Sequence, residues 1–573
     1  MKYTKQMALF TFSILFAISI IFLFPAVRFC AILFLESFLG KNNYNDIFYI
    51  LIRNFAIIGL FISIVGCFTV LTETGKNIYI ECISEWKRSF RSFINRRYLF
   101  LYLILSAIYI FGIITIIRAN FYYNDDLNRS LNGYRSWAGW GRYIPEFFSI
   151  IIHMNLRITD ISPLPQILAV FILAFSTIIF LKILSPDKVN AAAVIASIPI
   201  GLSPHLMENF SFKFDAPYMA LAVFFSIIPF LFYRKFKVYC ITSFLCLLAM
   251  CMSYQAASGI YIVMVLIISF RSFIIDEIPL KKIIFFICIS IANYILPLLF
   301  FKTLLLVRLQ DNGYSSTELF PILNIFPGML SNSIIYIKII ISDFKNSLII
   351  LIIPLSFILF IAINVKASGK NRLLTLAITL ILIPLILVMS FGAYIALIKP
   401  LWLPRAFIGF GFLLATILTY ITALPDTVKF LKFLSLILAV LLSYNFIIFD
   451  LTYGNALAEQ KQYQNFRTSL LITDINHYIG ENTEPVISIE NNIGFAPVIE
   501  NISKTYPLIK RLVYVTPYGG EDWGHLLLYH YKFNHTTNYP LSTDINNIFL
   551  PVLIDNQYHT IRGSENNILV TLK

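Results

Sequence analysis

Long apolar segments separated by short polar ones recur along the first 450 residues of the chain. Most are about 20 residues long, the length that a helix needs to cross roughly 30 Å of hydrocarbon while satisfying its own backbone hydrogen bonds. Thirteen segments are predicted to span a membrane: roughly 8–35, 49–72, 98–118, 166–184, 189–204, 216–233, 238–254, 257–270, 283–301, 347–365, 373–397, 406–424 and 430–449. The pattern predicts a polytopic α-helical membrane protein.

Composition agrees with this class. Hydrophobic residues make up 58% of the 573 residues and charged residues 13%, whereas a soluble globular chain has roughly 25% charged residues. The formal net charge is +14, yet residues 451–573 contain eight Lys and Arg against eleven Asp and Glu. The positive excess therefore lies in the membrane part, as the positive-inside rule describes, and gives no reason to expect nucleic-acid binding.

Lys and Arg cluster in alternate loops between the predicted spans. The clusters are Lys76 to Arg97, Lys182 and Lys188, Arg234 to Lys237, Arg271 to Lys282, and Lys366 to Arg372. With a cytoplasmic N-terminus, all of these loops are cytoplasmic. The loops at 119–165, 205–215, 302–343 and 399–405 are then predicted to lie on the outer side of the membrane, and so is the C-terminal segment.

The segment 451–573 is predicted to form a separate, small α/β domain, because its composition becomes mixed and polar. A helix is expected over 454–478. Short β-rich runs predict strands at 486–489, 511–515, 525–531, 548–554 and 567–572. Residues 1–450 are then predicted to form the membrane domain.

The loop 119–165 carries the adjacent acids Asp125 and Asp126 at the edge of an apolar span. A structural interpretation is that they cap a helix starting at Leu127. The loop is long for a connection, however, and it contains several arginines, Trp137 and Trp140, followed by an apolar run at 144–156 that predicts a helix along the membrane interface. Guanidinium groups suit phosphate oxygens, so the loop is predicted to bind a phospho-sugar.

Several strings in this chain are similar to a known family. In the first loop they are Asp125-Asp126-Leu127-Asn128-Arg129, Gly133, Trp137 and Gly141-Arg142, and a second run extends from Ser203 to Asp215 and on to Met219. Ser253-Tyr254-Gln255 and Tyr453-Gly454-Asn455-Ala456 add to the likeness. Together they resemble bacterial serotype-converting O-antigen glucosyltransferases of the type II Gtr family, in the GT-C superfamily.

The resemblance implies a GT-C-like fold and the transfer of glucose from undecaprenyl-phosphate glucose to lipid-linked O-antigen of lipopolysaccharide, on the periplasmic face of the inner membrane. Asp125 or Asp126 is then expected to be the catalytic base. The residues expected to bind the donor phosphate are Arg129, Arg142 and Arg405, and those expected to contact substrates are Trp137, Trp140, Lys213, Asp215, Tyr254 and Gln255.

Simpler interpretations remain open for some of these residues. For Asp215 the alternative is a pair with Lys213 or a cap on the helix that follows it. For Arg405 it is a side chain that only extends to the membrane interface, and for Tyr254 and Gln255 it is contact between packed helices. The adjacent aspartates are able to hold a divalent metal ion, but without a clear third ligand no metal is assigned.

Other functions share some of these features. An O-antigen polymerase or another lipid-donor transferase would also have an acidic outer loop. A polysaccharide or lipid transporter would need ionisable residues deep within spans and duplicated halves, and both signals are weak in this sequence. The expected partners are a polyprenyl-phosphate-linked sugar, a lipid-linked glycan acceptor and membrane lipids.

Overall fold

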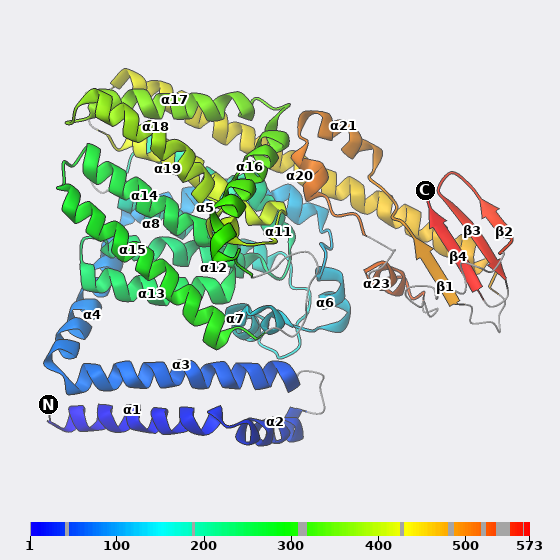
Figure 1. Ribbon diagram of the computed structural model, residues 1–573. Helices are drawn as coiled ribbons and strands as arrows, with labels where there is room; N and C mark the ends of the chain where they lie inside the picture. Colours follow the sequence, from blue (N-terminus) through cyan, green and yellow to red (C-terminus); the bar gives the residue numbers. More distant parts are fainter. Residues whose placement is uncertain are drawn as a thin grey trace.

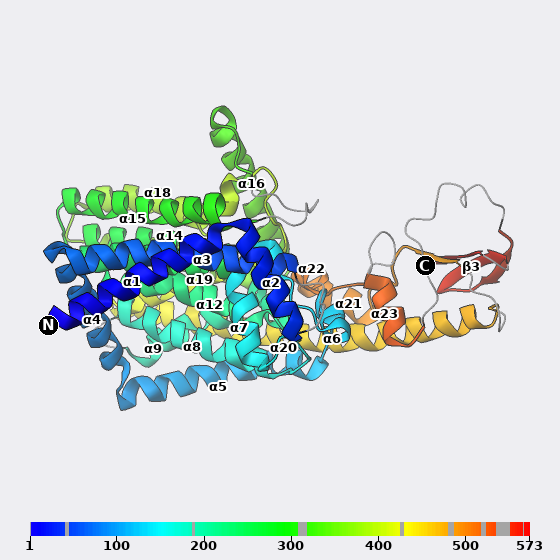
Figure 2. The ribbon, with the colours of Figure 1, turned by 90° about the horizontal axis from the view of Figure 1, so that it is seen from below.

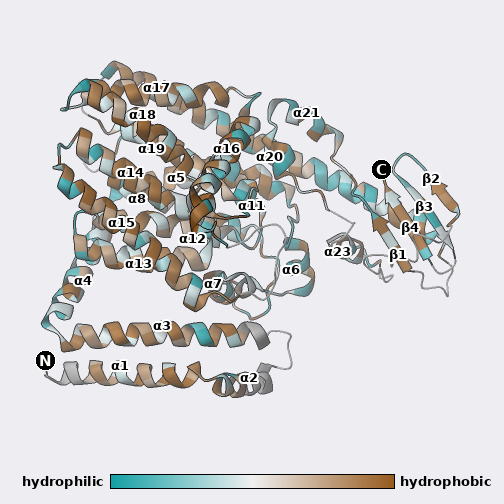
Figure 3. Cartoon of the chain, viewed as in Figure 1, coloured by the Kyte–Doolittle hydropathy of each residue, from teal (hydrophilic) through white to brown (hydrophobic). Residues whose placement is uncertain are grey.

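The computed structural model describes residues 2–39, 45–185, 189–307, 318–424, 429–479, 486–516, 523–533, 550–564 and 567–573. Most of the chain forms helices that lie side by side in a bundle, and a small sheet stands apart from it at the C-terminal end (Figure 1). Apolar residues run along the bundle helices, whereas the region beside the sheet is more polar (Figure 3). The predicted fold class, a polytopic helical membrane protein with a small C-terminal α/β region, is confirmed.

Within the described residues, eleven helices are long and apolar enough to cross a membrane. They are α3 (Asn45–Leu71), α5 (Arg96–Ala119), α8 (Leu164–Leu184), the series α9 (Ala191–Ser197), α10 (Pro199–Leu202) and α11 (Met207–Ser211), α13 (Phe236–Ser253), α14 (Ser258–Ile274), α15 (Leu280–Phe300), α16 (Ile325–Phe344), α17 (Ile349–Ala367), α18 (Arg372–Met389) and α20 (Lys429–Asn476). A pair bent by 89°, α1 (Lys2–Leu23) and α2 (Pro25–Leu39), adds a twelfth if it is one span.

Two further predicted spans correspond to shorter apolar helices. Helix α12 (Ala216–Ile227) continues into a 3₁₀ turn that ends at Phe232, and it packs against α8. Helix α19 (Ile408–Thr422) packs against α9. Both helices lie among the longer ones in the bundle (Figure 1).

Helix α16 corrects one expectation, because residues 302–343 were expected to form a loop. It is apolar enough to span, and it contacts the rest of the bundle through Asn332 and Asp343. Asn332 Nδ2 donates to the carbonyls of Ile395 and Leu397 at 3.0 and 2.9 Å, and Asp343 accepts from His205 Nε2 at 2.9 Å. Figures 1 and 2 show α16 at a steep angle to the bundle. Helix α16 is therefore an additional apolar helix in a stretch that was expected to be a loop.

The loops rich in Lys and Arg gather at one end of the bundle, which we call the basic end. There Lys182 of α8 donates to Ser92 of α4 (Glu73–Phe93), and Arg271 of α14 donates to the carbonyl of Leu184. The first loop and α11 lie at the opposite end (Figure 1), which we call the site end because it carries Asp125. This grouping agrees with the alternation of loops predicted from charge.

Helix α20 connects the bundle to the C-terminal region. It runs for 48 residues without a break, which is about 72 Å at 1.5 Å per residue, and its second half projects beyond the bundle (Figure 2). The predicted helix over 454–478 is confirmed as this second half. The predicted domain boundary at residue 451 falls inside α20.

The C-terminal sheet has the strand order β1-β4-β3-β2. Strand β1 (Val486–Glu490) pairs in parallel with β4 (Asn567–Leu572), and β3 (His559–Ser564) pairs antiparallel with β4 and with β2 (Val552–Asp555). The strands predicted at 486–489 and 567–572 are confirmed. The prediction at 548–554 agrees with β2 from Val552 onward; residues 548 and 549 lie outside the described residues.

Two other predicted strands are wrong. Residues 511–515 include the end of helix α22 (Leu508–Leu512), and residues 525–531 lie mostly in helix α23 (Trp523–His530). Apolar runs this short fit a strand and a buried helix equally well, so the tertiary contacts decide. Helices α21 (Pro497–Thr505) and α22 pack on the main core, whereas the sheet packs on the far end of α20.

Candidate functional site

The loop between α5 and α8 forms three short helices at the site end: α6 (Asp126–Asn132), a 3₁₀ turn (Trp137–Trp140) and α7 (Tyr143–His153). Gly133 and Gly141 end the first two with φ of 65° and 71°, a conformation that glycine adopts without strain. The helix predicted over 144–156 is confirmed as α7. It exposes Phe147, Phe148 and Ile151, as a helix at a membrane interface would.

Asp126 is fully buried and fastens the loop in place. Its Oδ2 accepts hydrogen bonds from the backbone N–H groups of Tyr123 at 3.1 Å and Lys213 at 3.0 Å. Its Oδ1 has no hydrogen-bond partner within the described residues. Burial raises the pKa of this carboxyl well above its ordinary value, because the charged form is poorly solvated. Asp126 thus joins the first loop to the segment before α12.

Asp125 differs from its neighbour in exposure. Its side chain is 32% exposed, and Oδ2 lies 3.6 Å from Nη2 of Arg129. It occupies the N-cap position of α6, but its side chain makes no capping hydrogen bond. The capping interpretation is therefore not what the structure shows for Asp125, and its carboxylate is open to a ligand.

Arg129 is buried between two carboxylates and an indole ring. Its Nη2 lies 3.8 Å from Asp215 Oδ2, and its Cζ lies 3.9 Å from the ring centroid of Trp137. Trp137 Nε1 in turn donates to Asp215 Oδ1 at 2.5 Å. Asp215 makes no side-chain cap for α12. The two strings singled out in the sequence thus meet through these three side chains.

Lys213 is held as a buried cation beside them. Its Nζ donates to Asp160 Oδ2 at 2.9 Å and to the side chain of Asn120, and it lies 4.0 Å from the ring centroid of Tyr122. Lys213 therefore pairs with Asp160, which leaves Asp215 to Trp137 and Arg129. All of these contacts lie within the first loop and the segment that precedes α12.

Arg142 faces a second aromatic side chain, Tyr254. Its Cζ lies 5.0 Å from the ring centroid, and its backbone N–H donates to the carbonyl of Trp137 at 3.0 Å. In the described part of the chain, no carboxylate oxygen lies within 4.0 Å of the Arg142 side-chain nitrogens. Tyr254 is buried and donates to the carbonyl of Arg405 at 3.3 Å. Arg142 and Arg405 therefore both adjoin Tyr254.

Arg405 is paired with Glu208. Its Nη1 lies 2.7 Å from Oε1, and its backbone N–H donates to Oε2 at 2.7 Å. Gln255 donates to the carbonyl of Cys251 at 2.7 Å, within its own helix region, and Trp140 is 37% exposed. Two of the three candidate phosphate ligands, Arg129 and Arg405, thus already face carboxylates, whereas Arg142 faces an aromatic ring.

Comparison with known proteins now places these residues in a family. Residues 114–416 match the model of the family described as Glucosyl transferase GtrII. The chain belongs to the GtrII glucosyl transferase family. The matched region covers more than half of the chain and includes every candidate residue from Asp125 to Arg405. The predicted resemblance is confirmed, and the family supports glycosyltransferase activity.

One relative is an "uncharacterized 55.3 kDa protein in gtrB 5'region" of Salmonella phage P22. It is 27% identical over 437 residues, which cover 73% of this chain and 87% of the relative. No solved structure matches the chain. The C-terminal residues that contact the site lie beyond the region matched by the GtrII family.

A polar cluster that the sequence analysis did not select adjoins the GtrII-family region. Asp343 of α16 accepts from His205 Nε2 at 2.9 Å and also pairs with Arg511 of α22. His205 and Asp343 are almost fully buried. Ionisable residues inside apolar helices were a usable signal, but three separate segments meet at this cluster, and no local pattern predicts such a meeting. The cluster fastens the C-terminal region to the bundle.

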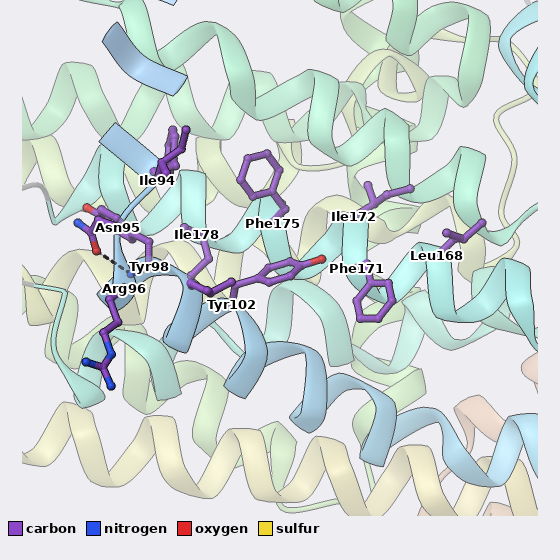
Figure 4. Close-up of a pocket in the computed structure, with 12 residues that line it drawn as sticks. Ile94, Asn95, Arg96, Tyr98, Tyr102, Leu168, Phe171, Ile172, Phe175 and Ile178 are labelled. Atoms are coloured by element: carbon purple, nitrogen blue, oxygen red, sulfur yellow. Dashed lines mark hydrogen bonds between the residues drawn. The ribbon is translucent and has the colours of Figure 1, made fainter. Parts of the chain in front are cut away.

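An apolar groove of about 720 Å³ lies between α5 and α8 on the basic half of the bundle. Figure 4 shows Tyr102, Phe171 and Phe175 along it, with Asn95 and Arg96 at one end. The groove extends along α8 from Ile178 to Leu168, which is about 15 Å of helix. Its lining suits a hydrocarbon chain and carries no catalytic side chain.

Among the described residues, no group of three or more His, Cys, Asp or Glu side chains is placed to hold a metal ion.

Proposed function

We propose that this chain transfers glucose from a polyprenyl-phosphate donor to lipid-linked O-antigen, or to a related surface glycan, at the periplasmic face of the bacterial inner membrane. The family supports the transfer of a glucosyl group. The observation that carries the proposal is that an accessible carboxylate, Asp125, belongs to one loop with Arg142, an arginine that has no carboxylate partner among the described residues.

Asp125 is the proposed catalytic base. Glycosyl transfer requires a group that takes the proton of the acceptor hydroxyl while the anomeric carbon develops positive charge. Asp125 is the more accessible of the two adjacent acids, and the Arg129 guanidinium 3.6 Å away orients its carboxylate. Asp126 is instead proposed to position the loop, because both of its hydrogen bonds are to backbone N–H groups.

Arg142 is the proposed main ligand of the donor phosphate. The polyprenyl phosphate leaves as an anion, and a guanidinium group that meets its growing charge lowers the barrier. The carbonyl of Arg405 accepts a hydrogen bond from the same Tyr254, and Glu208 orients the Arg405 guanidinium group. Arg129 is proposed to act indirectly, as a positioning residue that holds Asp125 and Asp215 in place.

The distribution of charge supports the assignment of the site to the periplasm. The Lys- and Arg-rich loops lie at the basic end, and short loops of this kind remain in the cytoplasm. The opposite face has no supply of nucleotide sugars, so a lipid-borne donor is required there. The apolar groove of Figure 4 is suited to the chain of such a lipid.

The proposal is tested with membranes that contain the chain, incubated with polyprenyl-phosphate [¹⁴C]glucose and lipid-linked O-antigen. We expect label in the glycan and a new glucose branch by linkage analysis. Longer glycan chains without new glucose would identify a polymerase instead. Label that crosses the membrane without any transfer would identify a transporter, and either outcome would contradict the proposal.

A further inference from the structure

A cavity of about 260 Å³, lined by both polar and apolar side chains, lies between the first loop and the C-terminal region. Its walls come from residues 120–127, from α20 beyond the bundle, from Tyr514 and Thr516, and from α23 and Tyr531. The volume lies just below the range of ordinary small-ligand pockets, roughly 300–1,000 Å³. It therefore suits one small ring rather than a long chain.

We infer that this cavity binds a sugar ring of the acceptor glycan. The inference rests on the proposed function, because it assigns the acceptor of that reaction to a site formed jointly by the first loop and the C-terminal region. The donor phosphate, in contrast, is assigned to Arg142 of the first loop, beside Tyr254.

An unsatisfied amide oxygen in the wall points to a ligand that donates hydrogen bonds. Gln464 of α20 is 8% exposed, and its Oε1 has no hydrogen-bond partner within the described residues. A buried acceptor without a partner costs about 1–3 kcal/mol. A sugar hydroxyl is a suitable donor to it. Asn120 and Asn465 add further amide groups to the same wall.

Aromatic side chains form another part of the lining. The rings of Tyr122 and His530 meet edge to face at 5.9 Å, and those of His530 and Tyr531 at 5.4 Å. Aromatic rings with a polar edge present apolar faces against which the C–H face of a pyranose packs. Amides beside aromatic rings are a lining suited to a neutral carbohydrate.

The charge of the cavity does not favour a phosphate. Lys461 is the basic side chain among its lining residues, and its Nζ donates to the carbonyl of Asn120 at 2.7 Å and lies 3.5 Å from that of Ala119. The ammonium group therefore faces these two backbone carbonyls. The cavity therefore differs in charge from the proposed donor site, where arginine side chains are expected to meet a phosphate.

The cavity is connected to the proposed catalytic loop. Asn120 and Tyr122 both contact Lys213, whose backbone N–H donates to Asp126. Leu127, two residues after Asp125, also lines the cavity. A glycan held in this cavity would extend along the loop that carries the proposed base.

The test uses the purified full-length protein and O-polysaccharide fragments released by mild acid hydrolysis from the bacterium that carries this chain. Binding of the fragments is measured by saturation-transfer NMR, and transfer kinetics are measured with the labelled donor. The variants are Gln464→Met, which keeps the side-chain length, and Asn465→Ala. The matched control is Gln462→Ala, an exposed amide of α20 outside the cavity.

We expect each cavity variant to weaken fragment binding and to raise the acceptor KM at least tenfold, with kcat and the donor KM unchanged and with the control like the wild type. Equal binding by the wild type and both variants, or no binding by the wild type, would overturn the inference. If the wild type binds fragments through Gln464 but transfers no glucose, the proposed function fails while the glycan site stands.

Discussion

Trp137 Nε1 donates a hydrogen bond of 2.5 Å to Oδ1 of Asp215, across 78 residues of sequence. The Arg129 guanidinium lies over the same indole ring, with its Cζ 3.9 Å from the ring centroid. One side chain of the first loop therefore joins the loop to the start of α12 and also supports the arginine that faces Asp125. The position of the proposed base depends on this bond.

Trp137→Phe keeps an aromatic ring under Arg129 but removes the N–H donor. A hydrogen bond to a charged group contributes about 1.5–3 kcal/mol, so we expect a loss of that size in unfolding free energy and a fall in transfer rate. Thermal unfolding of the purified protein in detergent measures the loss. Trp140→Phe is the control, since Trp140 is 37% exposed; an equal loss in both variants would contradict the role assigned to Trp137.

Asp126→Asn should leave the chain folded, because the amide oxygen accepts the same two N–H groups. Burial raises the folded-state pKa of Asp126. Its contribution to stability is complete below the ordinary carboxyl pKa of about 4 and is lost as the pH rises through the raised folded-state pKa. Asparagine does not ionise, so the stability of the variant relative to the wild type should increase with pH.

This difference is measured as the melting temperature of both proteins in steps from pH 5 to pH 8. A wild type that gains stability over the variant as the pH rises would contradict the prediction, because the buried carboxyl would then be stabilised in its charged form. The same variant should retain transfer activity, because the groups that Asp126 binds in the described part of the chain are backbone N–H groups.

Gly141→Ala tests the turn that precedes Arg142. The residue has φ of 71°, and a Cβ there would lie 2.6 Å from Leu306 Cδ1 and 2.9 Å from Phe301 Cζ. A non-glycine residue in this region costs roughly 1–2 kcal/mol, and crowding should displace Arg142 and lower transfer. Gly494→Ala is a matched control, since Gly494 has φ of 72° with no neighbour within 4 Å. It should lose similar stability and no activity; an equal loss of activity would contradict the prediction.

Arg142→Gln removes the guanidinium that faces Tyr254. Loss of one group that stabilises a developing anion typically lowers kcat by about 10²–10³, and we expect a loss of that order, partly restored by Arg142→Lys. Initial rates with labelled donor measure it. Arg157→Gln, an exposed arginine of the same loop, should change the rate little; an inactive Arg157 variant beside an active Arg142 variant would reverse the assignment.

Much of the fold follows from the sequence because spans are set by local hydrophobicity, and the first loop stands out by its charge. Helix α16 was missed because the polar residues Asn332, Ser333 and Asp343 interrupt its apolar run. The strand predicted at 525–531 was wrong because the hydrophobic periodicity of so short an apolar run does not distinguish a strand from a helix.

The candidate site was predictable as a set of residue types but not as a set of pairs. The sequence suggested Lys213 as a partner for Asp215. In the structure, Lys213 donates a hydrogen bond to Asp160, and Asp215 accepts one from Trp137. The contacts of Glu208 with Arg405 and of Asp343 with Arg511 join segments 197 and 168 residues apart. Pairing over such separations is decided by tertiary packing, which no local pattern contains.

The most direct test of the proposed mechanism is the rate of glucose transfer by Asp125→Asn, measured with polyprenyl-phosphate [¹⁴C]glucose beside Asp126→Asn at equal amounts of folded protein. General-base catalysis contributes about 10²–10⁴-fold. We therefore expect Asp125→Asn to lose at least a hundredfold in rate while Asp126→Asn keeps most of it. An active Asp125→Asn variant, or loss of transfer in Asp126→Asn alone, would contradict the assignment of the base.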